Sequence, residues 1–145
     1  MYARGINETK RAVLRELVVL IADGQSYSRS IMRTIITQLG VKSACDVNNG
    51  DAALEAIVTF EPSVMILDWN IPGLDAREIV RMVRGSRTLP NSALPIIAIS
   101  NSGKASVVNE ALALGVNYFL VKPISPRRSE EHTSELQSRG LISYA

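Results

Sequence analysis

The sequence predicts an α/β fold built around a parallel β-sheet. Residues 64–67 form an apolar run without polar alternation, which is typical of a strand that is buried on both faces of a sheet. Similar short runs alternate along the chain with longer segments that have the apolar spacing of helices. Because strands that alternate with helices are joined by crossovers, we expect all the strands to run parallel.

Composition places limits on the function. The chain has 145 residues, of which 46% are hydrophobic and 21% are charged, so one globular domain is expected. No apolar run approaches the roughly 18 residues of a membrane span, and we therefore expect a soluble, cytoplasmic protein without a membrane partner. The net charge of +2 is too small to indicate a nucleic-acid surface. The single cysteine, Cys45, excludes an internal disulfide and a cysteine-rich metal site.

Capping residues and apolar spacing set the boundaries of the predicted elements. Ser26 is suited to begin a helix as its N-cap, and Gly40 is suited to end it. In the next helix Leu54, Ile57 and Val58 are expected to face the core. The predicted order is helix 8–16, strand 17–22, helix 27–39, strand 43–47, helix 51–60, strand 64–68, helix 75–84, strand 95–99, helix 104–114 and strand 118–121.

Polar residues follow several of the predicted strands at the point where each strand ends. They are Asp23, Asp68, Ser100 and Lys122. The carboxyl ends of parallel strands meet at one edge of the sheet, so these side chains are expected to converge on one crevice. Alone, Asp68 is more typical of a residue that caps the turn at Pro72 and Gly73 than of a reactive group.

This set of groups suits phosphoryl transfer. Carboxylate oxygens, together with a backbone carbonyl, suit a hard cation such as Mg²⁺. The cation and the lysine would neutralise charge on a transferring phosphoryl group, and the hydroxyl can donate a hydrogen bond to a phosphoryl oxygen. Asp68 is placed to be the nucleophile.

Three motifs carry a resemblance to a known family: residues 68–73 (Asp-Trp-Asn-Ile-Pro-Gly), residues 94–100 and residues 121–123 (Val-Lys-Pro). Over residues 17–126 the chain resembles the receiver domain of two-component response regulators, most closely the single-domain chemotaxis type. The resemblance implies a doubly wound, flavodoxin-like sheet of five parallel strands in the order 2-1-3-4-5.

The resemblance also implies roles for the residues at the strand ends. Asp68 would accept a phosphoryl group from a histidine kinase or phosphotransfer protein, and Lys122 would contact that group. Asp23, Asp68 and the backbone carbonyl of Asn70 would bind Mg²⁺. Such a protein is not an enzyme in the usual sense, and it passes its signal to a downstream protein that the sequence does not identify.

A conformational switch is implied by the same resemblance. Ser100 would shift towards the phosphorylated aspartate, and Phe119 would respond to that shift. The bond between Lys122 and Pro123 would be cis.

Gly24 departs from the family pattern, in which a second acid usually follows the first strand and touches the metal. Ala76 and Asn101 are smaller departures near the same crevice. The loss of the acid favours weak Mg²⁺ binding, and it also favours an alternative function, a receiver-like binding module that signals without phosphorylation. A remoter alternative is a phosphatase of the haloacid-dehalogenase type, whose first motif would need an acid where Asn70 stands.

The end of the sequence looks unlike the family. From Arg128 the residues resemble the translation of a sequencing adapter, and His132, the only histidine, lies in this segment. We therefore expect an N-terminal extension at 1–16, a receiver domain at 17–127 and a non-native tail at 128–145. In this interpretation the fifth helix of the family fold is missing or replaced.

Overall fold

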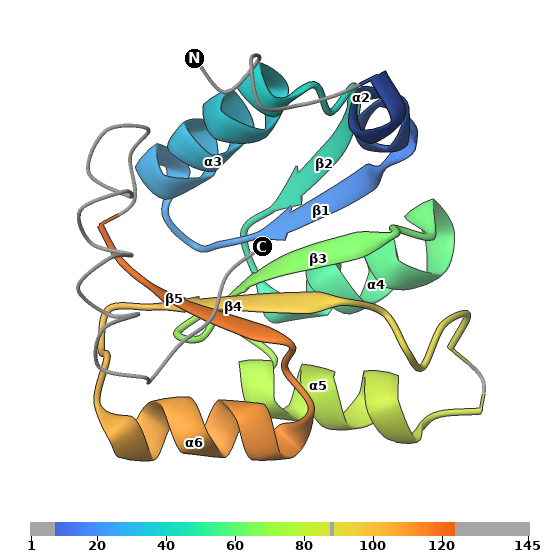
Figure 1. The fold of residues 1–145 in the computed structure, drawn as a ribbon. Helices are drawn as coiled ribbons and strands as arrows, with labels where there is room; N and C mark the ends of the chain where they lie inside the picture. Colours follow the sequence, from blue (N-terminus) through green and yellow to red (C-terminus); the bar gives the residue numbers. More distant parts are fainter. Residues whose placement is uncertain (1–7, 88, 124–145) are drawn as a thin grey trace.

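A single sheet of five parallel strands forms the centre of the fold, in the order β2-β1-β3-β4-β5 (Figure 1). The computed structural model describes residues 8–87 and 89–123. The strand order confirms the α/β, flavodoxin-like fold. The strands are β1 (Val18–Ala22), β2 (Ser43–Val47), β3 (Val64–Asp68), β4 (Ile96–Ser100) and β5 (Tyr118–Val121).

Helices cover both faces of the sheet. One face is covered by α3 and the other by α4, α5 and α6, while α2 precedes β1 (Figure 1). The expected loss of a helix after β5 concerns residues 128–145, which lie outside the described residues. The helices are α2 (Glu8–Glu16), α3 (Ser26–Leu39), α4 (Gly50–Phe60), α5 (Ala76–Gly85) and α6 (Ala105–Leu114).

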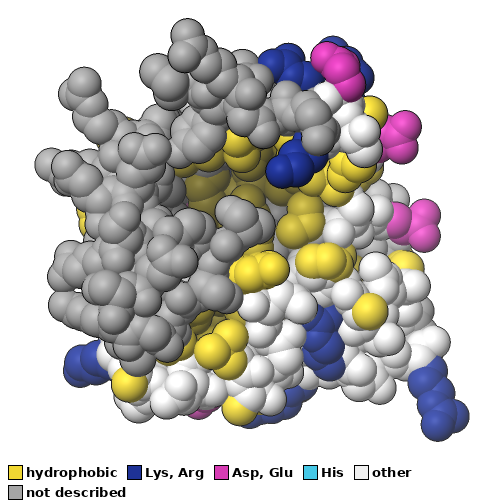
Figure 2. Space-filling view, viewed as in Figure 1, with side chains coloured by type: hydrophobic (Ala, Val, Ile, Leu, Met, Phe, Trp, Pro, Cys, Tyr) yellow, Lys and Arg dark blue, Asp and Glu magenta, His cyan; other side chains and the backbone are white. Residues whose placement is uncertain are grey.

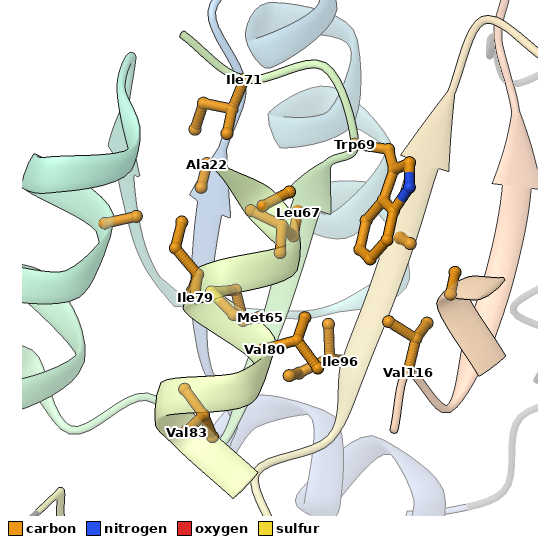
Figure 3. Packing of buried hydrophobic residues seen from close by; sticks show 14 of the residues in the cluster. Ala22, Met65, Leu67, Trp69, Ile71, Ile79, Val80, Val83, Ile96 and Val116 are labelled. Atoms are coloured by element: carbon orange, nitrogen blue, oxygen red, sulfur yellow. The ribbon is translucent and has the colours of Figure 1, made fainter. Parts of the chain in front are cut away.

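The larger of two hydrophobic clusters lies between the sheet and α4, α5 and α6. Met65 and Leu67 project from the central strand β3 and are completely buried. From α5, Ile79, Val80 and Val83 point towards the sheet (Figure 3). This packing fixes β3, and therefore Asp68 at its end, in the middle of the domain.

The smaller cluster lies between the sheet and α3, where Met32 and Ile36 are the buried residues of the helix. Next to it, an apolar cavity of about 90 Å³ is lined by residues of α3 and of β3, β4 and β5. Figure 2 shows hydrophobic side chains gathered in a hollow near the centre of this view.

Two local predictions are wrong. The residue at the N-cap of α3 is Gln25 rather than Ser26, and its side chain makes no capping hydrogen bond. In α4 the buried residues include Ala53, Ala56 and Ile57, while Val58 is 49% exposed. Small alanines allow α4 to lie close to the sheet, and this turns Val58 towards solvent.

Within residues 8–87 and 89–123, no helix has the length and apolar composition that a membrane span requires.

Candidate functional site

Two buried carboxylates lie at the carboxyl edge of the sheet. Asp23 directly follows β1, and Asp68 is the last residue of the neighbouring strand β3. Their exposed fractions are only 0% and 4%. Parallel pairing of β1 with β3 places the two strand ends side by side, as the sequence predicts.

The environment of Asp68 raises the pKa of its carboxyl group above the ordinary value. One carboxylate oxygen, Oδ1, accepts a hydrogen bond from the backbone N–H of Asn70 at 3.0 Å. Burial raises the pKa of Asp68, and the nearby carboxylate of Asp23 adds to this rise, which outweighs the opposing effects of Asn70 and Lys122. A carboxylate that is desolvated in this way has lost water that would otherwise shield it from an electrophile.

Lys122 connects the two carboxylates. Its ammonium nitrogen, Nζ, lies 3.0 Å from Oδ2 of Asp23 and 3.5 Å from Oδ2 of Asp68. It also donates a hydrogen bond to Oε1 of Gln25 at 3.3 Å. Oδ2 of Asp23 makes no hydrogen bond of good geometry, so Lys122 stabilises it through charge. The Lys122 side chain is 8% exposed, and such a pair is only weakly screened by solvent.

The predicted switch residues occupy different environments. Ser100 ends β4 and is 1% exposed, and its hydroxyl accepts a hydrogen bond from the N–H of Ser102 at 3.1 Å. Phe119 is fully buried within the larger cluster, and it pairs with Ala98 of β4. The peptide bond between Lys122 and Pro123 is cis, the isomer that the resemblance implies.

A cavity of about 240 Å³ lies next to Lys122, between α3 and the ends of β4 and β5. The cavity is lined by Gln25, Tyr27, Ser28, Ile31, Met32, Ile99, Asn101, Lys122 and Pro123.

Gly24 leaves the crevice without a third carboxylate. A Cβ atom on Gly24 would lie 2.7 Å from Cδ of Pro72, so the loop after β3 fills the space that a side chain would need. In the described part of the chain, no three His, Cys, Asp or Glu side chains are grouped to hold a metal ion. Asp23, Asp68 and the carbonyl of Asn70 remain oxygen donors of the kind that Mg²⁺ prefers. These donors therefore fit Mg²⁺, and two of them, the carboxylates, are charged.

Sequence reasoning missed two residues that contact this site, Gln25 and Arg29. Arg29 donates to the backbone carbonyl of Asp23 at 2.8 Å and to Oδ2 of Asp46 at 3.2 Å, and it thereby holds the end of β1. The sequence offered no signal for Gln25, because Ser26 is the better candidate for the N-cap by residue type.

Trp69, the only tryptophan, lies directly after Asp68. It is 3% exposed, and the guanidinium of Arg77 lies 5.4 Å from the centre of its ring. Arg77 also pairs with Glu110 of α6 at 2.7 Å. The residue next to Asp68 is thus connected to α5 and α6.

A parallel sheet in this strand order, with buried acids, a hydroxyl and a lysine at its carboxyl edge, defines a flavodoxin-like α/β protein. Residues 19–133 match the response regulator receiver domain family, and the chain belongs to that family. It is a CheY-like receiver domain of two-component signalling, a family that does not consist of conventional enzymes.

Individual relatives agree with this assignment. The chain is 30% identical to the chemotaxis protein CheY homologue of Campylobacter jejuni over 123 residues, which cover 84% of this chain and 93% of the relative. It is also similar to the receiver domain of the Francisella response regulator 1452, with a TM-score of 0.68, 25% identity and coverage of 86% and 99% of the two chains.

A third similarity concerns a metal-bound protein. The Mn²⁺-bound form of response regulator Rcp1 has the same fold, with a TM-score of 0.67, 19% identity and coverage of 89% and 97% of the two chains. Receiver domains typically bind a divalent cation, and membership of the family implies a histidine kinase as a partner.

Proposed function

We propose that this chain is a phospho-accepting switch and that Asp68 is the acceptor. A histidine kinase or phosphotransfer protein would supply the phosphoryl group. The observation that carries the proposal is the buried Asp68 carboxylate at the end of the central strand, with the Lys122 ammonium 3.5 Å away. A desolvated nucleophile beside a fixed positive charge is the arrangement that phosphoryl transfer requires.

In the proposed reaction, an oxygen of the Asp68 carboxylate attacks the phosphorus of the donor's phosphohistidine. The new O–P bond forms as the N–P bond breaks, and the imidazole leaves with the bonding electrons. Lys122 would neutralise charge on the phosphoryl oxygens, and the hydroxyl of Ser100, at the end of the neighbouring strand β4, would shift to donate a hydrogen bond to them. Phe119 would then respond through β5, and a downstream protein would detect the change.

Mg²⁺ is the proposed cation, and Asp23, Asp68 and the carbonyl of Asn70 would hold it. When bound, it would supply further positive charge to the phosphoryl oxygens. Binding is expected to be weak, since affinity at such sites depends on the number of charged ligands and Gly24 contributes none.

We further infer that residues 17–127 form the receiver domain, with 1–16 as an extension and 128–145 as a non-native tail. Helix α2 lies within the extension, and the family match at residues 19–133 includes most of the proposed domain and the first residues of the proposed tail. Urea unfolding of residues 17–127 and of the full chain would test these boundaries: equal midpoints are expected, because neither the extension nor the tail is proposed to belong to the domain.

The experiment is incubation with a small acyl phosphate and Mg²⁺, followed by intact-mass measurement. A single phosphoryl adduct is expected on the parent protein and none on Asp68→Asn. Glu78→Gln is the matched control, because it also replaces one carboxylate with an amide but lies on the exposed side of α5, and it is expected to retain the adduct. An adduct that persists in Asp68→Asn would exclude Asp68 as the acceptor.

A second candidate function is a binding module that signals without phosphorylation. It is favoured by Gly24 and by Lys122, which already neutralises part of the charge of both carboxylates. In that case no adduct would form at any Mg²⁺ concentration, and Asp68→Asn would not change binding to the downstream protein.

A further inference from the structure

Gln25 occupies a position where a different type of residue is expected. It precedes α3 as the N-cap residue, with extended backbone angles, yet its side chain makes no capping hydrogen bond. Serine, threonine, aspartate and asparagine are preferred at this position because their short side chains can reach the first N–H groups of the helix. An N-cap residue of a disfavoured type, beside the candidate site, indicates a role other than capping.

The side chain of Gln25 is directed towards Lys122 instead. Its oxygen Oε1 accepts hydrogen bonds from Nζ of Lys122 at 3.3 Å and from the hydroxyl of Ser28 at 3.1 Å. The backbone N–H of Gln25 donates to Oδ1 of Asp23 at 2.8 Å. Gln25 therefore contacts both the lysine and the first carboxylate, and the same amide oxygen also accepts the hydrogen bond from Ser28.

The ammonium group of Lys122 needs three acceptors, because it carries three N–H donors and has no lone pair. Two of its partners are the carboxylates of Asp23 and Asp68, which attract it through charge, and the third, Gln25, accepts its hydrogen bond. A directional hydrogen bond fixes the orientation of the ammonium group, which attraction by charge alone does not. The third is neutral, so it adds no negative charge beside the place where a phosphoryl group would arrive.

We propose that Gln25 is a positioning residue for Lys122, holding the ammonium between the two carboxylates so that it meets the incoming phosphoryl group. The proposal rests on the function proposed above, although the contact itself exists in the unphosphorylated protein. Without the Gln25 acceptor, one N–H of Lys122 turns to the neighbouring cavity and the ammonium samples more orientations.

A double-mutant cycle in urea unfolding tests the contact, using Gln25→Met, Lys122→Met and the double variant of the full chain. Methionine is similar in length to both side chains but lacks the amide oxygen and the charge. The two single effects are expected to be non-additive by about threefold or more in the unfolding equilibrium constant, a modest value because Gln25 is exposed. Gln25→Glu, which keeps an oxygen acceptor, is expected to preserve the coupling to Lys122. If Lys122→Met does not fold, Lys122→Ala takes its place, because it also removes every donor to Gln25.

The rate of phosphorylation by a small acyl phosphate tests the role of the contact. Gln25→Met is expected to slow the reaction about threefold to tenfold, the loss of one hydrogen bond to a charged group near the surface. Ser28→Ala is the matched control: it removes the other hydrogen bond to Oε1 and leaves Lys122 its acceptor, so a smaller effect is expected.

Additive unfolding effects would overturn the proposal, and so would an unchanged rate in Gln25→Met or an equal loss in Ser28→Ala. A parent protein that accepts no phosphoryl group would contradict the proposed function instead. In that event the unfolding cycle alone decides whether Gln25 positions Lys122.

Discussion

Replacing Gly24 with alanine is expected to destabilise the fold through one steric contact. The new Cβ would lie 2.7 Å from Cδ and 3.2 Å from Cγ of Pro72, both in a ring that cannot rotate away. Gly24 does not adopt a left-handed φ, so backbone strain does not contribute. The β3–α5 loop would have to move away from the end of β1.

The magnitude follows from two opposing effects. Overpacking of this kind costs about 1–3 kcal/mol, while loss of glycine's flexibility in the unfolded chain returns about 0.4–1 kcal/mol. Taking the middle of both ranges, the net destabilisation of Gly24→Ala is about 1.3 kcal/mol, which lowers the folded-to-unfolded ratio roughly ninefold. For a domain of this size the melting temperature should fall by about 3–8 °C.

Urea unfolding followed by the fluorescence of Trp69 is a suitable assay, because this buried residue is the only tryptophan. Gly85→Ala is the matched control, since no atom lies within 4 Å of the Cβ that it would add, and it is expected to be neutral or stabilising. Pro72→Ala removes Cγ and Cδ, so Gly24→Ala should cost little in that background.

A neutral Gly24→Ala, or a penalty that persists in Pro72→Ala, would refute this reasoning.

The contact between Gly24 and Pro72 also affects metal binding. Gly24→Asp would add the missing acid, but we expect it to tighten Mg²⁺ binding fully only when Pro72 is also replaced, which a Mg²⁺ titration of Trp69 fluorescence can measure.

Three further predictions concern stability. Asp68→Asn is expected to raise resistance to urea at pH 7, because the pKa of Asp68 is raised in the folded protein. The protonated carboxyl group stabilises the fold at pH values below the unfolded pKa, and this contribution is lost as pH rises through the folded pKa. The gain should shrink as the pH is lowered below about 4, and no gain at pH 7 would contradict the burial argument. Asp46→Asn should have the opposite effect and lower the free energy of unfolding by up to about 1 kcal/mol at pH 7, because the hydrogen bond from Arg33 lowers the pKa of Asp46. The stability that the ionised Asp46 contributes is lost as pH falls through its folded pKa. Equal urea midpoints of parent and variant at pH 7 would show that this pair contributes nothing. Arg84→Met should cost about 1–3 kcal/mol, because the guanidinium donates to the carbonyls of Gly115 and Ser92 and to Asn117. Arg81→Met, which replaces a side chain that is 56% exposed, is the control and should cost less than about 0.5 kcal/mol.

Much of the sheet could be predicted from the sequence, because its strands are short apolar runs closed by polar residues or turns. The bounds of β2 and β5 and the end of β3 at Asp68 agree with the prediction. Helix faces were less predictable. The sequence predicts that Val58 faces the core, but the side of α4 that packs on the sheet carries Ala53 and Ala56. Val58 lies on the exposed side of the helix.

The candidate site was predictable to the extent that it depends on topology. Parallel crossovers alone require Asp23 and Asp68 to lie at one edge, and the structure places them there. The contact of Gln25 with Lys122 was not predictable, because the two residues are 97 positions apart and meet only through the conformations of two loops. The approach of Pro72 to Gly24 likewise depends on a loop rather than on a periodic element.

The most direct test of the central proposal is chemical identification of the modified residue. Protein treated with a small acyl phosphate and Mg²⁺ is reduced with borohydride, which converts an aspartyl phosphate to homoserine, and its peptides are then sequenced by mass spectrometry. The proposal predicts homoserine at position 68 and aspartate at position 23. Homoserine at any other position, or unreduced aspartate at both positions after treatment, would contradict it.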